Sequence, residues 1–167
     1  MTALDFDWVI RGRLALGSAP VRSAHLFQLR EEGVRSILSL CASSEAPPPP
    51  GLEAQFHCRR VVLADHRSSL SNTAAELLFA VQTLEQLEAE LAPVFVHCVA
   101  SVERSPLVCI AWLMRQRHLS RLQALDYMMA IHPLSSPLTS QLQLLEAIGQ
   151  ESLPKPQNLL PEDWRHA

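Results

Sequence analysis

The chain has 167 residues, of which 48% are hydrophobic, and a formal net charge of −3 at pH 7. A chain of this length can bury one hydrophobic core and has little material for a second one. The negative net charge and a single lysine argue against a general nucleic-acid-binding surface. Apolar runs such as residues 107–114 are far too short to span a bilayer.

We therefore expect one domain over residues 1–152 and a proline-containing tail over residues 153–167. The four cysteines, at positions 41, 58, 98 and 109, show no metal-ligand spacing, and the acidic start of the sequence does not resemble a secretory signal. A chain of this kind is expected in the reducing environment of the cytoplasm.

The first part of the sequence alternates short apolar runs with turn and helix signals. Two of these runs flank Gly12, a residue typical of a tight turn between strands. Gly33 follows a helix-like segment, where a glycine commonly ends a helix. The elements expected here are strands over residues 8–10 and 14–18, a helix over residues 23–33 and a strand over residues 34–40.

The middle of the sequence begins with a proline-rich stretch, residues 42–51. This stretch cannot form a helix or a central strand, so a surface loop is expected. The elements expected next are a strand over residues 58–65, an amphipathic helix over residues 71–92 capped near Ser71 or Asn72, and a strand over residues 94–98. Such an alternation of strands and helices indicates an α/β layer fold.

A cysteine and an arginine stand between the last of these strands and an apolar helix. Cys98 ends the strand, Arg104 comes six residues later, and Pro106 suits the first turn of a helix, where its missing N–H costs nothing. A loop from a strand to a helix N-terminus can turn backbone N–H groups toward an anion. An arginine can grip two phosphate oxygens. This pattern predicts a phosphate-binding loop.

The same spacing recurs at Cys109 and Arg115, inside the apolar helical stretch. Helix amides already bond to carbonyls one turn back, so this second pair cannot form an anion site. At the loop, by contrast, helix amides and a nearby cation favour the thiolate form of a cysteine. Cys98 is therefore a candidate nucleophile. The alternative is that Cys98 is an unreactive residue of the core.

The segment HCVASVERSP, residues 97–106, resembles the HC-x5-R-S/T signature of cysteine-dependent protein phosphatases. Residues 8–40 are similar to the start of compact dual-specificity phosphatases, and residues 121–148 resemble their closing pair of helices. The resemblance covers most of the chain. It implies an α/β fold with a central mixed, mainly parallel sheet of four to five strands flanked by helices.

The resemblance also implies roles for individual residues in phosphate-ester hydrolysis. Cys98 would attack phosphorus to form a cysteinyl-phosphate, and the hydroxyl of Ser105 would hydrogen-bond the departing thiolate. Asp65 stands where the compact family places its general acid, although an aspartate there can instead cap a turn. Neither a metal nor an organic cofactor is implied. The residues expected to bind the substrate phosphate are Val99, Ala100, Ser101, Val102, Glu103 and Arg104.

Two residues of the loop depart from the family pattern. Ser101 stands where most members carry glycine, so it adopts either an ordinary conformation or a strained one. The carboxylate of Glu103 would repel a dianionic substrate unless it points away. Rhodanese-type cell-cycle phosphatases have a similar Ser and Glu-Arg arrangement, but their fold does not resemble the flanking segments of this chain.

Histidines and one further cysteine complete the candidates. His97 is expected to support the loop through backbone hydrogen bonds rather than to transfer protons. Cys41 directly follows a strand, and the compact family can place a cysteine at this point behind the catalytic loop. It is either a redox partner of Cys98 or a buried structural thiol. The remaining histidines expected at surface or turn positions are His25, His57, His118, His132 and His166.

Three functions are compatible with the sequence. The first is a phosphatase for phosphotyrosine proteins, with or without phosphoserine and phosphothreonine, and the short chain predicts a shallow pocket. The second is a phosphatase for a small phosphomonoester or another non-protein substrate, such as a phosphoinositide, a nucleotide or an RNA 5′ end. The third is a weakly active phosphate-binding pseudophosphatase, which the departures at Ser101 and Glu103 suggest.

Overall fold

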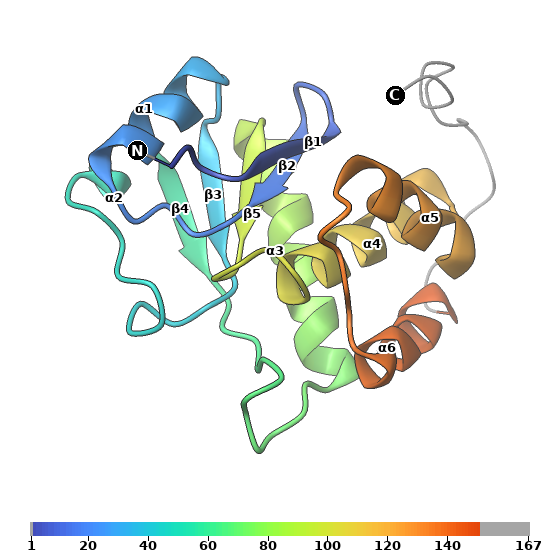
Figure 1. Cartoon of the computed structure of the whole chain (residues 1–167). Helices are drawn as coiled ribbons and strands as arrows, with labels where there is room; N and C mark the ends of the chain where they lie inside the picture. The colour runs from blue at the N-terminus through green and yellow to red at the C-terminus, as the bar shows by residue number, and fades with distance from the viewer. Residues whose placement is uncertain (1, 151–167) are drawn as a thin grey trace.

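Five strands form one sheet in the computed structural model, which describes residues 2–150 (Figure 1). Their order across the sheet is β1-β2-β5-β3-β4; β1 and β2 are antiparallel, and the other pairs are parallel. The strands are β1 (Phe6–Ile10), β2 (Leu14–Gly17), β3 (Ser36–Ser39), β4 (His57–Arg60) and β5 (Val94–His97). The predicted mixed, mainly parallel sheet is confirmed, and β5 is its central strand.

Within residues 2–150, six helices flank this sheet, and α6 packs on α3 and α4 rather than on the strands. In Figure 1, α1 and α2 lie on one side, and α3, α4, α5 and α6 lie on the other. The helices are α1 (Ser23–Glu31), α2 (Leu52–Gln55), α3 (Ala74–Leu91), α4 (Arg104–Arg117), α5 (Arg121–Ile131) and α6 (Thr139–Gln150). None of these helices is both long and apolar enough to cross a membrane. The tail predicted over residues 153–167 lies outside the described residues.

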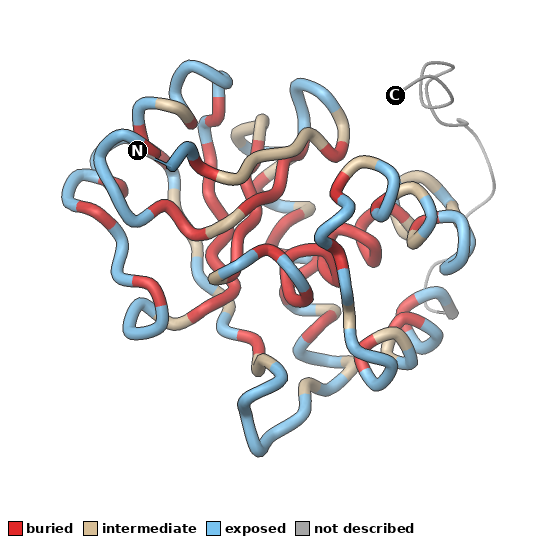
Figure 2. Tube along the Cα trace, viewed as in Figure 1, coloured by how far each residue is buried: buried red, intermediate tan, exposed pale blue. Residues whose placement is uncertain are grey.

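The two faces of β5 belong to separate hydrophobic clusters, because successive side chains of a strand point to opposite sides. Val94 and Val96 pack with residues of α3 and α4, including the fully buried Trp112. Phe95 packs on the other face with residues of α1. Figure 2 shows the buried stretches that run through the sheet and α4. Cys98 belongs to the cluster of Val94 and Val96, so β5 delivers it to the N-terminus of α4.

The long helix α3 begins after a different residue from the one expected. Its N-cap is Thr73, so the predicted cap near Ser71 or Asn72 is wrong. The hydroxyl of Thr73 accepts a hydrogen bond from the N–H of Glu76, and the carboxylate of Glu76 accepts one from the N–H of Thr73. This reciprocal pair is a capping box, which fixes the start of the helix.

The strand β4 ends at Arg60 instead of continuing to residue 65, and residues 61–73 form a loop. The side-chain amide of Asn72 closes this loop. Its oxygen accepts from the N–H of Ala64 at 2.7 Å, and its nitrogen donates to the carbonyl of Ala64 at 2.8 Å. Asp65 therefore lies on a loop that is held at both ends, rather than at the end of a strand.

Candidate active site

The loop between β5 and α4 begins with Cys98. This residue is 2% exposed, and its Sγ lies 3.3 Å from the Oγ of Ser105 in the first turn of α4. The Oγ of Ser105 is in turn 3.1 Å from the Oγ of Ser101. The structure thus brings together the thiol and the hydroxyl that the sequence predicts as partners, and it adds a second hydroxyl from the loop.

The carbonyl groups of Cys98 and Val99, the first two of the loop, accept hydrogen bonds from residues outside the loop. The Nδ1 of His97 lies 3.0 Å from the carbonyl oxygen of Cys98, and the N–H of Ala19 donates to the carbonyl of Val99 at 3.0 Å. In a trans peptide the N–H points away from the C=O of the same unit. The N–H groups of Val99 and Ala100 therefore point away from these partners and into the loop.

Two further carbonyl groups are bound by the segment between α5 and α6. The Nε2 of His132 lies 2.7 Å from the carbonyl oxygen of Ser101, and the N–H of Ser136 donates to the carbonyl of Val102 at 2.6 Å. The N–H groups of Val102 and Glu103 consequently point into the loop as well. Inward N–H groups form an anion-binding concavity.

His132 begins a turn, as expected, because its carbonyl accepts from the N–H of Ser135 at 3.0 Å, but it is 1% exposed and not at the surface. The same expectation is wrong for His25, which is buried within α1.

His97 supports this loop as an uncharged residue. Burial lowers the pKa of its imidazole from 6.5 to about 4. The Nδ1 therefore donates to the carbonyl of Cys98, while the Nε2, which lies 2.8 Å from the Oγ of Ser39, accepts from that hydroxyl. This backbone contact is the one predicted from the sequence. Both ring nitrogens are engaged, which suits a structural support rather than a proton carrier.

The guanidinium of Arg104 is buried and anchored along one edge. Its Nη1 and Nη2 bond to the two carboxylate oxygens of Glu45 at 3.3 and 3.0 Å, and Nη1 also donates to the carbonyl of Leu63 at 3.1 Å. The buried Nε has no hydrogen-bond partner among the described residues. This Nε–H and the second N–H of Nη2 lie on one edge of the planar group, so Arg104 offers two parallel donors to an oxyanion.

Glu45 is a site residue that sequence reasoning missed. It lies in the proline-rich stretch of residues 42–51, which forms a loop as predicted but also carries a carboxylate to Arg104. Burial acts to raise the pKa of Glu45, but hydrogen bonds from Arg104 and from the N–H of Ala42 outweigh it and hold the pKa below its ordinary value. A lone acidic residue beside four prolines gives no signal from which this contact could be found.

Asp65 lies beside Arg104, with one carboxylate oxygen 3.9 Å from Nη2. Arg67 binds the same carboxylate through its N–H at 3.0 Å and through Nε and Nη2 at 2.8 and 2.6 Å. Burial acts to raise the pKa of Asp65, but the bonds from Arg67, with the charge of Arg104, hold the pKa below its ordinary value. The structure therefore places the candidate acid at the site in its ionised form.

Glu103 turns its carboxylate toward the loop that carries Asp65. One of its oxygens accepts from the N–H of His66 at 2.8 Å, and the other lies 3.4 Å from the Nδ1 of His66. The residue is 7% exposed. Its carboxylate is thus engaged by a neighbouring backbone group, and it lies within 4.8 Å of the carboxylate of Asp65.

The sequence left open whether Ser101 has an ordinary or a strained backbone conformation, and the structure shows the strained one. The φ of Ser101 is 57°, in the left-handed region that a residue with a Cβ adopts at a cost. A glycine would adopt this conformation without that cost. The surrounding structure must therefore hold Ser101 in place.

Cys41 follows β3, which lies beside β5. Ser39 is the register partner of His97, and the N–H of Leu40 donates to the carbonyl of His97 at 2.8 Å. Cys41 and Cys98 therefore follow the ends of two adjacent parallel strands. Burial raises the pKa of Cys41, and all four cysteines are free thiols.

The second Cys-x5-Arg pair lies inside α4, as predicted. Cys109 is fully buried, and burial raises its pKa. Arg115 bonds to the carboxylate of Glu85 in α3 at 2.8 Å. Neither residue belongs to the loop after Cys98.

A cavity of about 290 Å³ opens beside Asp65. It lies between the loop of residues 64–72 and the start of α6, and its apolar lining includes Leu138 and Leu144. Polar groups from Ser68, Ser71 and Gln141 complete the wall. The cavity adjoins the candidate acid rather than the loop of Cys98.

One family of proteins matches most of the chain. The model of the family described as dual specificity phosphatase, catalytic domain, matches residues 18–150. The human protein Dual specificity protein phosphatase 9 is 35% identical over 126 residues, which make up 73% of this chain and 30% of the human protein. The chain therefore corresponds to about a third of the length of that curated relative.

Solved structures share the fold. A variant of human DUSP28 superposes with a TM-score of 0.69 at 26% identity, over 90% of this chain and 97% of that one. Tk-PTP in its active form superposes with a TM-score of 0.75 at 21% identity, over 87% of this chain and 97% of that one. The second likeness concerns the fold alone. Together they confirm the predicted α/β architecture.

Proposed function

The chain belongs to the dual-specificity phosphatase family, and we propose that it hydrolyses phosphate monoesters through a cysteinyl-phosphate intermediate. The observation that carries this proposal is the orientation of the loop after Cys98, whose bound carbonyls leave the N–H groups facing inward. Arg104 adds two parallel donors. A transferring phosphoryl group gathers charge on three equatorial oxygens, and such donors stabilise that charge.

In the first step, the thiolate of Cys98 attacks phosphorus in line with the ester oxygen. A bond forms between sulfur and phosphorus, and the bond between phosphorus and the leaving oxygen breaks. The leaving oxygen needs a proton, for which Asp65 is the candidate donor. Arg104 binds two of the equatorial oxygens through its free edge, while Glu45 holds the opposite edge.

Asp65 must take up a proton before it can act as the acid. Arg67 favours the ionised carboxylate, but the side chain of Arg67 is 64% exposed and can turn into solvent. We infer that substrate binding separates this pair. Removal of the Arg67 bonds, together with burial of the site, then favours the protonated acid.

In the second step, water attacks the cysteinyl-phosphate. The carboxylate of Asp65 accepts a proton from that water, inorganic phosphate is released, and Cys98 leaves as a thiolate. The hydroxyl of Ser105, 3.3 Å from the sulfur, stabilises the departing thiolate by donating a hydrogen bond. The proposed roles draw on two segments: Asp65 comes from the loop after β4, and the other three side chains come from the loop after β5 and the first turn of α4.

Phosphotyrosine proteins are the substrates that we propose, with phosphoserine and phosphothreonine proteins accepted as well. The cavity beside Asp65 would hold the part of the protein that flanks the phosphorylated residue. The free thiols support a reducing, cytoplasmic setting. A phosphatase for a non-protein monoester remains the second candidate, and a survey of phosphopeptides against phosphoinositides and nucleotides separates the two.

The pseudophosphatase hypothesis is disfavoured by the two residues that suggested it. The carboxylate of Glu103 accepts a hydrogen bond from the N–H of His66. The bond between His132 and the carbonyl of Ser101 keeps the N–H of Val102 pointing into the loop. Hydrolysis of para-nitrophenyl phosphate by the native chain and by Cys98→Ser tests the proposal. We expect turnover only in the native chain, whereas both should bind inorganic phosphate. Absence of turnover in the native chain would leave the pseudophosphatase hypothesis standing.

A further inference from the structure

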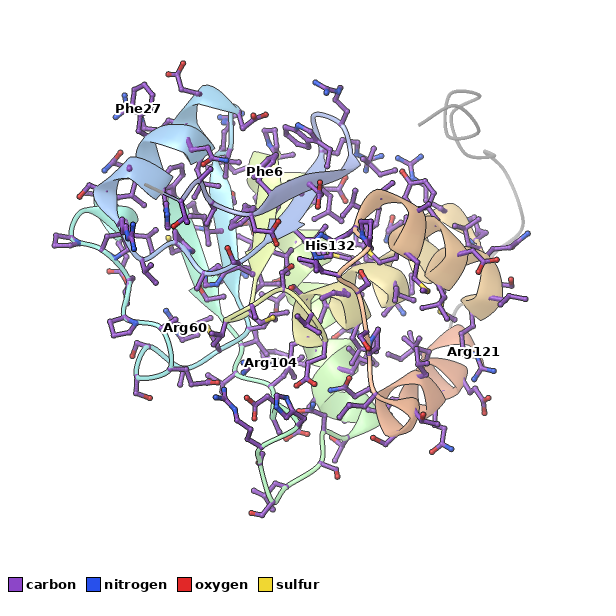
Figure 3. The ribbon with its side chains drawn as sticks, in the orientation of Figure 1. Phe6, Phe27, Arg60, Arg104, Arg121 and His132 are labelled. Carbon is purple, nitrogen blue, oxygen red and sulfur yellow. The ribbon has the colours of Figure 1, made fainter. Side chains whose placement is uncertain are left out.

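The strained backbone of Ser101 is held by a side chain far away in the sequence. His132, on the segment between α5 and α6, places its Nε2 2.7 Å from the carbonyl oxygen of Ser101. Figure 3 shows His132 between the strands β1 and β2 and the helical layer. The ring is 1% exposed, so this hydrogen bond is shielded from water. His132 therefore contacts the phosphate loop from behind.

The other ring nitrogen of His132 is bound by the first strand of the sheet. Its Nδ1 lies 2.6 Å from a carboxylate oxygen of Asp7, in β1. Asp7 is thus linked through one imidazole to the carbonyl of Ser101. The link joins three segments of the chain: β1, the turn before α6, and the loop after β5.

His132 holds the loop through both of its ring nitrogens. Its Nδ1 faces a carboxylate oxygen of Asp7, and its Nε2 faces the backbone carbonyl oxygen of Ser101. His97, by contrast, contacts the carbonyl of Cys98 and the hydroxyl of Ser39. Two buried histidines therefore support the loop, and each does so through a different pair of partners.

The hydrogen bond from His132 acts on the peptide unit that matters for anion binding. Holding the carbonyl of Ser101 outward directs the N–H of Val102 inward. Ser136, four residues after His132, holds the next peptide unit in the same way, at 2.6 Å from the carbonyl of Val102.

We propose that His132, oriented by Asp7, is a positioning residue that keeps Ser101 in the left-handed conformation required for phosphate binding. This role rests on the proposed phosphatase function, since it concerns the same loop. A glycine at this position would adopt the conformation without such support. In this chain, the Asp7–His132 pair replaces that conformational freedom.

A double-mutant cycle tests the proposal, because a glycine at position 101 removes the need for support. We expect His132→Ala to lower kcat/KM for para-nitrophenyl phosphate by about 10²-fold, since a misplaced loop loses its fit to the transition state. In the Ser101→Gly background, His132→Ala should cost less than about threefold. Equal losses in the two backgrounds, or no loss in either, would overturn the proposal.

Controls separate positioning from general stability. His25 is also buried and lies outside the site. When His25→Ala and His132→Ala lower the free energy of unfolding equally, His25→Ala should still leave kcat/KM unchanged. If His132→Ala does not fold, Asp7→Asn takes its place, because Asp7 is 38% exposed and the amide keeps an oxygen acceptor. The loss of kcat/KM caused by Asp7→Asn should again be smaller in the Ser101→Gly background. An equal loss in both backgrounds would contradict the positioning role of His132.

The cycle also has a readout that does not depend on turnover. Titration of each variant with inorganic phosphate, followed by NMR, measures the anion affinity of the loop directly. We expect the dissociation constant to rise about tenfold in His132→Ala and to recover in the double variant. If the native chain binds phosphate without hydrolysing esters, the proposed activity fails while the role of His132 is still measured. If phosphate affinity is the same in all variants, the role of His132 fails instead.

Discussion

The carboxylate of Glu103 accepts a 2.8 Å hydrogen bond from the backbone N–H of His66, and this bond joins the phosphate loop to the loop of the candidate acid. Glu103 directly precedes Arg104, and His66 directly follows Asp65. The two halves of the site are therefore tied together by a residue that, judged by charge alone, would weaken phosphate binding. Its burial, at 7% exposed, keeps the contact out of bulk water.

Replacing Glu103 with alanine should release the loop that carries Asp65. A general acid matters most for poor leaving groups, so hydrolysis of a phosphotyrosine peptide should slow by about tenfold, and that of an activated aryl ester by much less. Steady-state kinetics with both substrates measures the effect. Glu53→Ala, at an exposed position on α2, is the matched control. Faster hydrolysis of both substrates would mean that Glu103 repels the phosphate after all.

Glu45 should help phosphate binding, although both groups are anions that contact Arg104. Because Glu45 binds only one edge of the guanidinium, Glu45→Ala should leave the arginine misoriented and raise the dissociation constant for inorganic phosphate by about tenfold. Calorimetric or NMR titration measures this change. Tighter binding in the variant would show instead that Glu45 competes with phosphate for Arg104.

The pairing of Arg67 with Asp65 should set the pH dependence of the acid step. The acid acts when protonated, so activity toward a poor leaving group falls as pH rises through the pKa of Asp65. Arg67 holds that pKa low, and Arg67→Met should raise it because burial then acts with less opposition. The falling limb of the kcat/KM profile for a phosphotyrosine peptide should therefore move to higher pH.

Arg11→Met provides the control for this profile, since Arg11 is exposed in the turn between β1 and β2. An unchanged falling limb in Arg67→Met would remove Asp65, or its pairing with Arg67, from the acid step. Asp65→Asn should abolish the falling limb altogether and slow the peptide reaction by about 10²-fold.

We propose that Cys41 is the redox partner of Cys98. Peroxide would oxidise the thiolate of Cys98 to a sulfenic acid, and the thiol of Cys41 would displace water from it to form a disulfide. The strand ends are adjacent, and a disulfide needs a Cα separation below about 7 Å. Mild peroxide should inactivate the native chain reversibly, whereas Cys41→Ser should recover poorly with reductant.

Cys58→Ser is the matched control for this experiment, because Cys58 is a free thiol on β4 at the edge of the sheet. It should recover like the native chain. Peptide mapping without reductant should find Cys98 linked to Cys41. Oxidised Cys98 that is never linked to Cys41 would leave Cys41 as a structural thiol of the core.

The sequence was most informative where local rules operate. The apolar run before Cys98, the proline in the first turn of α4 and the helical setting of Cys109 follow from periodicity and backbone chemistry, and each is present in the structure. The cap of α3 was misplaced by a short distance, because Ser71, Asn72 and Thr73 are all good N-caps and only the partner Glu76 decides among them.

The contacts that organise the site lay beyond local rules. Glu45 lies 59 residues before Arg104, and Asp7 lies 125 residues before His132. Neither position carries a periodic pattern or a motif, since an acidic residue in a loop or on an edge strand is ordinary. The role of Glu45 depends on the packing of the proline-rich loop against α4, and that of Asp7 on the meeting of β1, the turn before α6 and the loop after β5.

Trapping the covalent intermediate tests the central claim most directly. The native chain would be mixed with a phosphotyrosine peptide, quenched in acid within one turnover, digested and examined by mass spectrometry. The account predicts that the peptide containing Cys98 gains one phosphoryl group, and that Cys98→Ser neither gains it nor turns over substrate. A phosphoryl group on any other residue, or steady turnover by Cys98→Ser, would contradict it.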